Sequence, residues 1–322
     1  MVKPAFFQFN EETAVSNAFQ TQKSDWLISH EKTIVEFEKV QQELASHGIE
    51  VIVVNDTPNP IKPDAIFPNN RVSTHGEGIA VLYPMLTPNR QLEKQNPVLG
   101  TLQKEYGYNI KETLDLTNHE KDSVALEWTW SLLLDRVNHI AYVSLSPRAN
   151  LKVLNEFCEK MWYTPLTFTS YNALSIKPDE PIYHTNVILS IGENFAVCCL
   201  DAIRDEDEKI SVKNSLEQTW HEVINIIMDQ MWNHFAGNML TVKNNAWNHY
   251  TLMSQNAYDS LTKEQIQTLE KYVTIIAVAI PTIENIWWGS VRCMLLENFL
   301  PKQSTTQSPI TSHQDKLSGD GC

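Results

Sequence analysis

The sequence predicts an α/β fold built from a repeated unit, five copies of which would close into a pseudo-symmetric propeller. The first observation is that five hairpin-like segments recur at spacings of roughly 50 residues, a period at which propellers and repeat arrays are found. The second is that a helix pattern follows every one of them except the last. Because a closed ring leaves no sheet edge exposed, we expect an N-terminal helix and strand to supply what the last unit lacks.

The N-terminal segment predicts this closing helix and strand. Apolar residues recur at helical spacing over 31–47, and Gly48 is a suitable C-cap. The apolar run 49–54 is typical of a buried strand. The first full unit then has a hairpin over 71–85, which turns at Gly76-Glu77-Gly78, and a helix over 97–106, which stops at Gly107.

The later units repeat this order of hairpin and helix. Each hairpin is an apolar segment interrupted by a short polar turn, and each helix carries apolar residues at helical spacing. The expected elements are a hairpin over 130–145 with a helix over 151–161, a hairpin over 183–200 with a helix over 213–220, a hairpin over 234–253 with a helix over 262–272, and a strand pair over 290–300.

Composition is compatible with one large domain or two ordinary ones, and it indicates no nucleic-acid or membrane partner. We expect a single domain over 1–301 and a disordered tail over 302–322, where the sequence becomes too polar to pack. Acidic residues outnumber basic ones by 39 to 25, and no stripe of Lys and Arg could neutralise phosphates. No run approaches the roughly 20 apolar residues of a membrane span, and the first ten residues carry no leader pattern. A cytoplasmic protein is the expectation; its oligomeric state is not readable.

The cysteines predict free thiol chemistry rather than disulfides or zinc. Their number is odd, and no Cys-x-x-Cys or His-x3-His spacing accompanies them. We therefore expect no zinc site, and hydrolysis at a free thiol would need no metal and no organic cofactor. The five cysteines are Cys158, Cys198, Cys199, Cys293 and Cys322.

Polar residues that could take part in catalysis lie near the start of successive units, where a ring would turn them toward one axis. Taken singly, each has a structural explanation: Cys293 as a small buried hydrophobe, His184 as a hydrogen-bonded core residue and Glu127 as a strand-edge carboxylate. Together they would form a nucleophile, a proton shuttle and an anchor for NH groups. The other residues of this kind are Asp64 with Asn69 and Asn70, and His234 with Asn238.

Six motifs stand in order over nearly all of 4–301. They are Pro63-Asp64-Ala65-Ile66-Phe67-Pro68-Asn69-Asn70, Leu126-Glu127, Leu145-Ser146-Pro147-Arg148, Tyr183-His184-Thr185-Asn186-Val187, Phe235-Ala236-Gly237-Asn238-Met239-Leu240 and Gly289-Ser290-Val291-Arg292-Cys293-Met294. This series resembles the citrulline-utilising hydrolases, which belong with the arginine deiminases, amidinotransferases and dimethylarginine dimethylaminohydrolases. The resemblance implies a five-bladed α/β propeller of the pentein kind, with the active site in its central channel.

The resemblance also implies the roles of single residues. Cys293 would be the nucleophile, His184 the general acid and base, and Glu127 and Asp64 the groups that hold the substrate NH groups. Two arginines, Arg90 and Arg148, match positions that would bind the carboxylate of an amino-acid substrate, a task for which the guanidinium fork is suited. Their alternative reading is a surface salt bridge.

Amides at two positions bear on the charge of the substrate. The deiminases of this superfamily place a carboxylate two residues after the catalytic histidine, where this chain has Asn186, and the position after Asn69 is Asn70 rather than a carboxylate. Two amides in place of two anions favour a neutral ureido group over a guanidinium. We therefore expect hydrolysis of citrulline to ornithine, carbon dioxide and ammonia through a covalent thiol intermediate. The alternatives are an arginine deiminase, a dimethylarginine hydrolase and an inactive ligand-binding relative.

Tryptophan stands where the family pattern has glycine. Nine Trp against ten Gly is an unusual ratio, because glycine is ordinarily about 7% of residues. Either the tryptophans are genuine and obstruct the site, or they record a UGA codon that the source reads as glycine. The positions beside the predicted site are Trp128, Trp130, Trp287 and Trp288, and the same exchange is expected at Trp162 and Trp247, which look like helix ends or turns.

Overall fold

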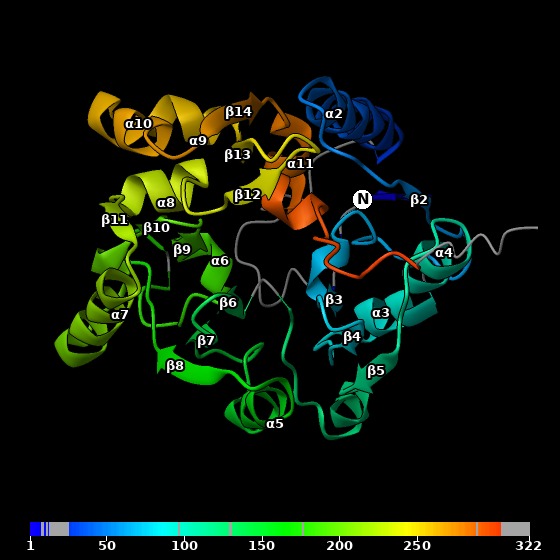
Figure 1. The fold of residues 1–322 in the computed structure, drawn as a ribbon, viewed down its shortest axis with the longest axis horizontal. Coiled ribbons are helices and arrows are strands. Elements are labelled where there is room, and N and C mark those ends of the chain that lie inside the picture. The colour runs from blue at the N-terminus through cyan, green and yellow to red at the C-terminus, as the bar shows by residue number, and fades with distance from the viewer. Residues whose placement is uncertain are drawn as a thin grey trace, which may run out of the picture.

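Small sheets separated by helices make up the chain, an α/β fold (Figure 1). The computed structural model describes residues 1–7, 10, 12, 26–95, 97–128, 131–175, 177–287 and 289–303. None of the helices in these ranges has the length and apolar character needed to cross a membrane.

Four sheets are built alike. In each, two antiparallel strands are followed by a helical segment and then by a third strand, which pairs in parallel with the second. This confirms the repeated hairpin and helix and adds a strand to each unit. The sheets consist of β3 (Val72–Thr74), β4 (Ile79–Leu82) and β5 (Glu112–Asp115); β6 (Leu133–Asp135), β7 (Ile140–Ser144) and β8 (Thr164–Phe168); β9 (Leu189–Ile191), β10 (Phe195–Cys198) and β11 (Glu222–Asn225); and β12 (Leu240–Lys243), β13 (His249–Ser254) and β14 (Thr274–Val278).

Three of the helices between these strands, α4, α5 and α10, lie close to their expected positions, whereas α7 begins at Glu206, seven residues before the expected helix over 213–220. Helix α5 spans Leu151–Met161, and its N-cap Asn150 accepts a hydrogen bond from the backbone of Lys152. Helix α10, Lys263–Glu270, begins with a capping box between Thr262 and Gln265. The other helical segments are α3 (Pro88–Gln91), η2 (Leu92–Gln95), α4 (Val98–Lys104), η3 (Thr117–Asp122), η4 (Leu200–Ala202), α7 (Glu206–Gln218), α8 (Met228–His234) and α9 (Gln255–Ser260).

The N-terminal segment reaches the last sheet through a helix. Helix α2, Trp26–Ser46, lies beside β14 and α11 (Pro281–Trp287), as Figure 1 shows. Buried side chains of α2, among them Phe37 and Leu44, share one apolar cluster with Ile276. The expected strand over 49–54 is reduced to β2, Val54–Asn55, which pairs in parallel with β1, Val2–Lys3. The two ends of the described chain are thus brought together by apolar packing.

Two sequence-based expectations about strands were wrong. Residues Thr185–Ile188 form a short helix, α6, in place of the first half of a strand. The strand pair over 290–300 is absent: Val291–Met294 is a 3₁₀ turn, η5, and the chain then runs on without a strand partner. The hydroxyl group of Thr74 satisfies backbone groups of that run, by donating to the carbonyl oxygen of Glu297 and accepting from the N–H of Phe299.

The expected tail lies almost entirely outside the described residues. Lys302 and Gln303 are described, and the N–H of Gln303 donates to the carbonyl oxygen of Gly107 at 2.8 Å. Residues 304–322 are not described.

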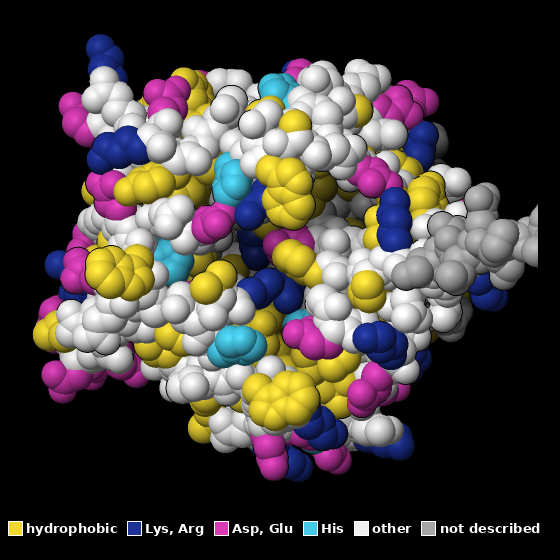
Figure 2. Space-filling view, in the orientation of Figure 1, with side chains coloured by type: hydrophobic (Ala, Val, Ile, Leu, Met, Phe, Trp, Pro, Cys, Tyr) yellow, Lys and Arg dark blue, Asp and Glu magenta, His cyan; other side chains and the backbone are white. Residues whose placement is uncertain are grey.

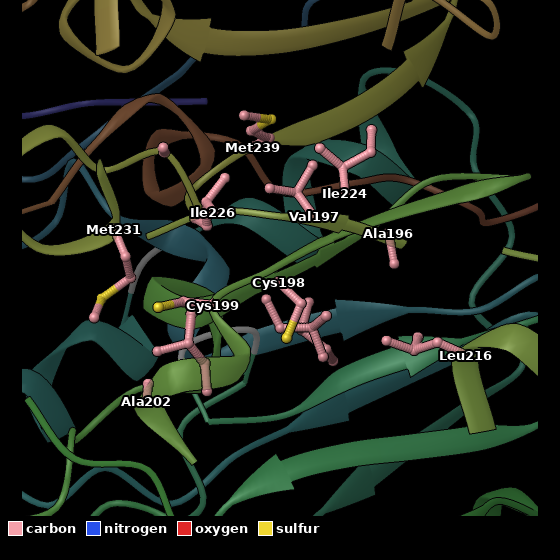
Figure 3. Close-up of a cluster of buried hydrophobic side chains, with 14 of the residues drawn as sticks. Ala196, Val197, Cys198, Cys199, Ala202, Leu216, Ile224, Ile226, Met231 and Met239 are labelled. Carbon is pink, nitrogen blue, oxygen red and sulfur yellow. The ribbon is translucent and has the colours of Figure 1, made fainter. Parts of the chain in front are cut away.

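Buried apolar side chains around β9, β10 and β11 form a large core cluster (Figure 3). It includes two of the cysteines, Cys198 and Cys199, which point into the cluster with Met231 and Leu216. Burial raises the pKa of the Cys199 thiol to about 12. These thiols therefore stay protonated near neutral pH and act as packing groups.

Candidate active site

The loop over 64–70, which ends in the 3₁₀ turn η1 (Pro68–Asn70), connects three of the predicted site segments. The carbonyl oxygen of Asn70 accepts a 2.7 Å hydrogen bond from the N–H of Trp128, beside Glu127. The side chain of Asn69 donates to the carbonyl oxygen of Arg292, beside Cys293, at 3.5 Å. Segments far apart in the sequence thus converge on one buried loop.

Glu127 is completely buried and paired with Arg148. Its Oε2 atom lies 3.0 Å from Nη1 of Arg148, and its Oε1 atom accepts a hydrogen bond from the backbone N–H of Leu86 at 3.1 Å. Burial alone would raise the pKa of Glu127, but the charge of Arg148, with smaller effects of His184 and Arg90, lowers it below the ordinary range. Glu127 is therefore an ionised acceptor at neutral pH.

His184 stands at the N-terminus of α6 with extended backbone, next to Glu127. Its Nε2 atom lies 3.7 Å from Oε2 of Glu127. Burial lowers the pKa of His184 well below the usual histidine value, and the contact with Glu127 opposes this effect only in part. A neutral imidazole at pH 7 can accept a proton from a thiol and later return it to a departing amine.

Cys293 lies in η5 with its sulfur against two amide side chains. The Nδ2 atom of Asn238 lies 3.5 Å from Sγ, and the Nδ2 atom of Asn186 lies 3.8 Å from it. Asn186 comes two residues after His184, so the segment carrying the predicted base adjoins the predicted nucleophile. Among the described cysteines there is no disulfide, and Cys293 is buried.

Asp64 belongs to a second buried cluster of charges. Its Oδ2 atom accepts a hydrogen bond from Asn10 at 3.0 Å and lies 3.5 Å from Nε of Arg90. Arg90 in turn forms two hydrogen bonds with the carboxylate of Glu93, at 2.8 and 3.0 Å. Burial, reinforced by the nearby charge of Glu93, raises the pKa of Asp64 to about 7 although Arg90 opposes it.

The structure brings the expected residues together and excludes only the alternative reading of the two arginines; their binding of a substrate carboxylate stays a prediction. Neither forms a surface salt bridge, because both are buried. Each is already ion-paired with a carboxylate of this chain, Arg148 with Glu127 and Arg90 with Glu93. Glu93 is a site residue that was not predicted from the sequence, although its spacing of three residues from Arg90 in a helical segment is a recognisable signal.

A cavity of about 890 Å³ lies beside the segments that carry Cys293 and Glu127, but its lining does not include Cys293, His184 or Glu127. Its lining includes Arg136, Arg292 and Trp128, and the last two are the chain neighbours of Cys293 and Glu127. Figure 2 shows a hollow near the centre of the face, with Lys and Arg side chains gathered in it. In the described part of the chain, no group of His, Cys, Asp and Glu side chains is arranged to hold a metal ion.

Trp128 does not obstruct Glu127. Its ring is buried, stacks on Tyr83 at 5.3 Å between centroids, and lies under the guanidinium of Arg136. It is not among the described residues with left-handed backbone, so the expectation of a strained glycine position was wrong there. Trp130 and Trp288, and the side chain of Trp287, lie outside the described residues.

The chain shares its fold with solved structures of an arginine dihydrolase and of a dimethylarginine dimethylaminohydrolase. It belongs to the family described as N,N dimethylarginine dimethylhydrolase, eukaryotic, which matches residues 3–300. Members of this family hydrolyse C–N bonds, so the chain is an enzyme of that class. None of the curated proteins matches the chain.

Solved structures share the fold at low sequence identity. Unliganded ArgZ, an arginine dihydrolase from the ornithine–ammonia cycle in cyanobacteria, has a TM-score of 0.69 and 14% identity over 94% of this chain and 41% of ArgZ. The N-terminal domain of ArgZ bound to product has a TM-score of 0.67 and 16% identity over 94% and 98% of the two chains. A dimethylarginine dimethylaminohydrolase variant in adduct with S-methyl-L-thiocitrulline has a TM-score of 0.60 and 13% identity over 92% and 96%. The chain thus spans less than half of complete ArgZ.

Proposed function

We propose that this enzyme hydrolyses the ureido group of citrulline, with Cys293 as the nucleophile. The observation that carries the proposal is the charge balance of the site. The carboxylate of Glu127 is neutralised by Arg148, and that of Glu93 by Arg90. The pKa of Asp64, raised to about 7, leaves a large fraction of this carboxyl group uncharged near neutral pH.

A ureido group fits this balance because, unlike a guanidinium, it brings no charge that would lack a partner. Two acceptor oxygens in the loop, Oδ1 of Asp64 and Oδ1 of Asn70, are buried without a hydrogen-bond partner among the described residues. The NH groups of a ureido substrate would satisfy such acceptors, whereas a buried guanidinium would require an ionised carboxylate to offset its desolvation.

The first half of the reaction forms a covalent intermediate. The neutral imidazole of His184 takes the proton of the Cys293 thiol, and the thiolate attacks the ureido carbon. A carbon–sulfur bond forms, and the tetrahedral centre collapses as the carbon–nitrogen bond to ornithine breaks. His184 returns its proton to the departing nitrogen, which leaves a thiocarbamate on Cys293.

The second half releases the enzyme. His184 removes a proton from a water molecule, the water oxygen bonds to the thiocarbamate carbon, and the carbon–sulfur bond breaks. The products are carbamate, which decomposes to carbon dioxide and ammonia, and the regenerated Cys293 thiol. Glu127 orients His184 and stabilises its protonated form in both halves, since its Oε2 atom lies 3.7 Å from the imidazole.

The sheets would be the blades of a five-unit propeller around this site. The repeated strand order of four sheets supports this, as does the pairing of β1 with β2 across helix α2 in a fifth sheet. The site segments come from different units, which is the arrangement expected for a channel along the axis of such a ring.

Hydrolysis of arginine or dimethylarginine is the second candidate. It is favoured by Asp64, which in its ionised form would offer a carboxylate to a guanidinium, and by the substrates in the names of the family and of ArgZ. The third candidate is a ligand-binding relative without turnover.

Separate incubations with citrulline, arginine and dimethylarginine distinguish these candidates, with ornithine, citrulline and ammonia as the measured products. Ornithine and ammonia from citrulline are expected, and the Cys293→Ala variant should keep the fold and lose turnover. Turnover of arginine or dimethylarginine alone would overturn the substrate, and turnover by Cys293→Ala would overturn the mechanism. Substrate binding by the unaltered chain without product would establish the third candidate.

A further inference from the structure

Two amide side chains flank the sulfur of Cys293. The side chain of Asn238 approaches Sγ with both of its polar atoms, Nδ2 at 3.5 Å and Oδ1 at 3.7 Å. Asn186 approaches it with Nδ2 at 3.8 Å. All three residues are at most 3% exposed, so solvent competes little for these contacts.

The local backbone holds the two amides in place. The Nδ2 atom of Asn238 also donates to the carbonyl oxygen of Asn186 at 3.3 Å, which couples the two loops. Gly237 packs directly on the other loop, because a Cβ atom there would come within 2.1 Å of the carbonyl oxygen of Val187. Glycine at 237 is therefore required for Asn238 to reach the sulfur.

We propose that Asn238, with Asn186, stabilises the thiolate form of Cys293 and orients it for attack, which gives Asn238 a role in the reaction. The proposal rests on the proposed function only in taking Cys293 as the nucleophile. Hydrogen bonds to an ionised acceptor are stronger than those to its neutral form, so two N–H donors at the sulfur favour the thiolate. The Oδ1 atom of Asn238 can accept the S–H proton of the resting thiol, so the same side chain serves both protonation states.

The pH dependence of alkylation by iodoacetamide tests this without any substrate. The rate at which the peptide containing Cys293 is modified is followed by mass spectrometry, which separates it from the other thiols. Asn238→Ala removes one donor and should raise the midpoint of the rate profile by about one pH unit, the effect of one hydrogen bond to a charged group. Asn238→Asp keeps the shape of the side chain, places an anion beside the sulfur and should raise the midpoint further.

Asn233→Ala is the matched control. Asn233 lies five residues earlier in the chain, is exposed, and donates to Asp229 on the surface. Its replacement should leave the midpoint unchanged. An unchanged midpoint in Asn238→Asp, or in a folded Asn238→Ala, overturns the proposal. A different result, the absence of ornithine after incubation with citrulline, would overturn the proposed function. A shifted midpoint would still support the role of Asn238 in that case.

Discussion

Trp162 ends helix α5 in the same left-handed backbone conformation in which Gly48 ends the C-terminal turn of helix α2. The φ angles are 55° and 73°, and in both places the N–H of the next residue donates to the carbonyl oxygen five positions earlier. Trp220, with φ of 65°, repeats this after helix α7. Glycine suits such a C-cap because it has no Cβ atom, whereas the Cβ atom of tryptophan makes left-handed backbone sterically unfavourable. These two tryptophans are also more than 70% exposed and contribute little packing in return.

Replacing Trp162 with glycine should therefore stabilise the protein. Relief of the left-handed strain is worth about 1 kcal/mol, and the exposed ring leaves no cavity behind. Trp220→Gly should act in the same way, and the two effects should add because the residues lie in different units. Urea denaturation of the single and double variants measures the gain in the free energy of unfolding.

Trp232→Gly serves as the control for this prediction. Trp232 belongs to helix α8 and its side chain is buried, so the removal of that side chain should destabilise the fold by about 3–5 kcal/mol. Loss of stability in Trp162→Gly and Trp220→Gly as well would show that their rings hold the fold together.

Because Arg148 is ion-paired with Glu127, its replacement should affect stability and kcat as well as KM, whereas loss of a residue that only binds the substrate carboxylate would mainly raise KM. Arg148→Met leaves the carboxylate of Glu127 buried without its cationic partner, so it should cost about 3–5 kcal/mol of stability and lower kcat as well as raise KM. Adding Glu127→Gln to Arg148→Met should restore part of the stability, because it removes the unpaired charge. Thermal or urea unfolding of both single variants and of the double variant gives the coupling. A change in KM alone would mean that Arg148 binds the substrate carboxylate instead.

Asp64→Asn should stabilise the protein at alkaline pH and not at acidic pH. Burial raises the pKa of Asp64 from 3.8 to about 7 in the folded chain, so the folded state binds this proton more tightly than the unfolded state. The stability it contributes is fully present below pH 3.8 and is lost as the pH rises through 7. At pH 8 the asparagine variant should gain roughly 2–4 kcal/mol relative to the original chain.

Urea unfolding of the original chain and of Asp64→Asn at pH 4, 6 and 8 measures the difference in their free energies of unfolding. The contributions of the other titrating groups cancel in this difference. A difference that stays constant over this range would contradict the raised pKa. Citrulline turnover should fall in the variant, because the proposed acceptor oxygen at Asp64 is one of those that hold the substrate.

The sequence predicted the bounds of an element correctly where a local signal determines them. Helix α5 starts and ends where expected because Asn150 caps it and its apolar residues recur at helical spacing. The third strands were missed for a physical reason. The clearest case is β5, Glu112–Asp115, an edge strand whose residues are mostly exposed and polar and so form no apolar run. This reason does not extend to β14, Thr274–Val278, whose residues are mostly apolar.

The sequence could place the site residues but not their partners. Motif order indicated Glu127, His184 and Cys293, and the fold brings their segments together. That Arg148 pairs with Glu127, 21 residues away, depends on how two loops pack. The contacts between the amide side chains and the sulfur likewise depend on the turn at Gly237. This turn packs closely against another loop, and no local sequence pattern reveals that approach.

The left-handed tryptophans also predict what the natural protein contains. Of the non-glycine residues described with positive φ, Trp162, Trp220 and Trp247 are three of six. Bulky side chains are rare in this region of backbone space, and the chain has nearly as many Trp as Gly. A UGA codon read as glycine explains both facts, so we expect glycine at these three positions in protein from its natural source.

Mass spectrometry of tryptic peptides from that source tests this prediction. The peptide 161–204 carries position 162, because trypsin does not cleave between Lys177 and Pro178. The peptide 214–243 carries position 220 together with position 232, which lies in a helix and does not require glycine. The peptide spanning Glu127 to Arg136 reports on 128 and 130 beside the site. Glycine at 128, where tryptophan now packs on Tyr83, would open the wall of the adjoining cavity. Tryptophan at 162, 220 and 247 in the natural protein would contradict the codon explanation, because these are the positions at which the backbone favours glycine most.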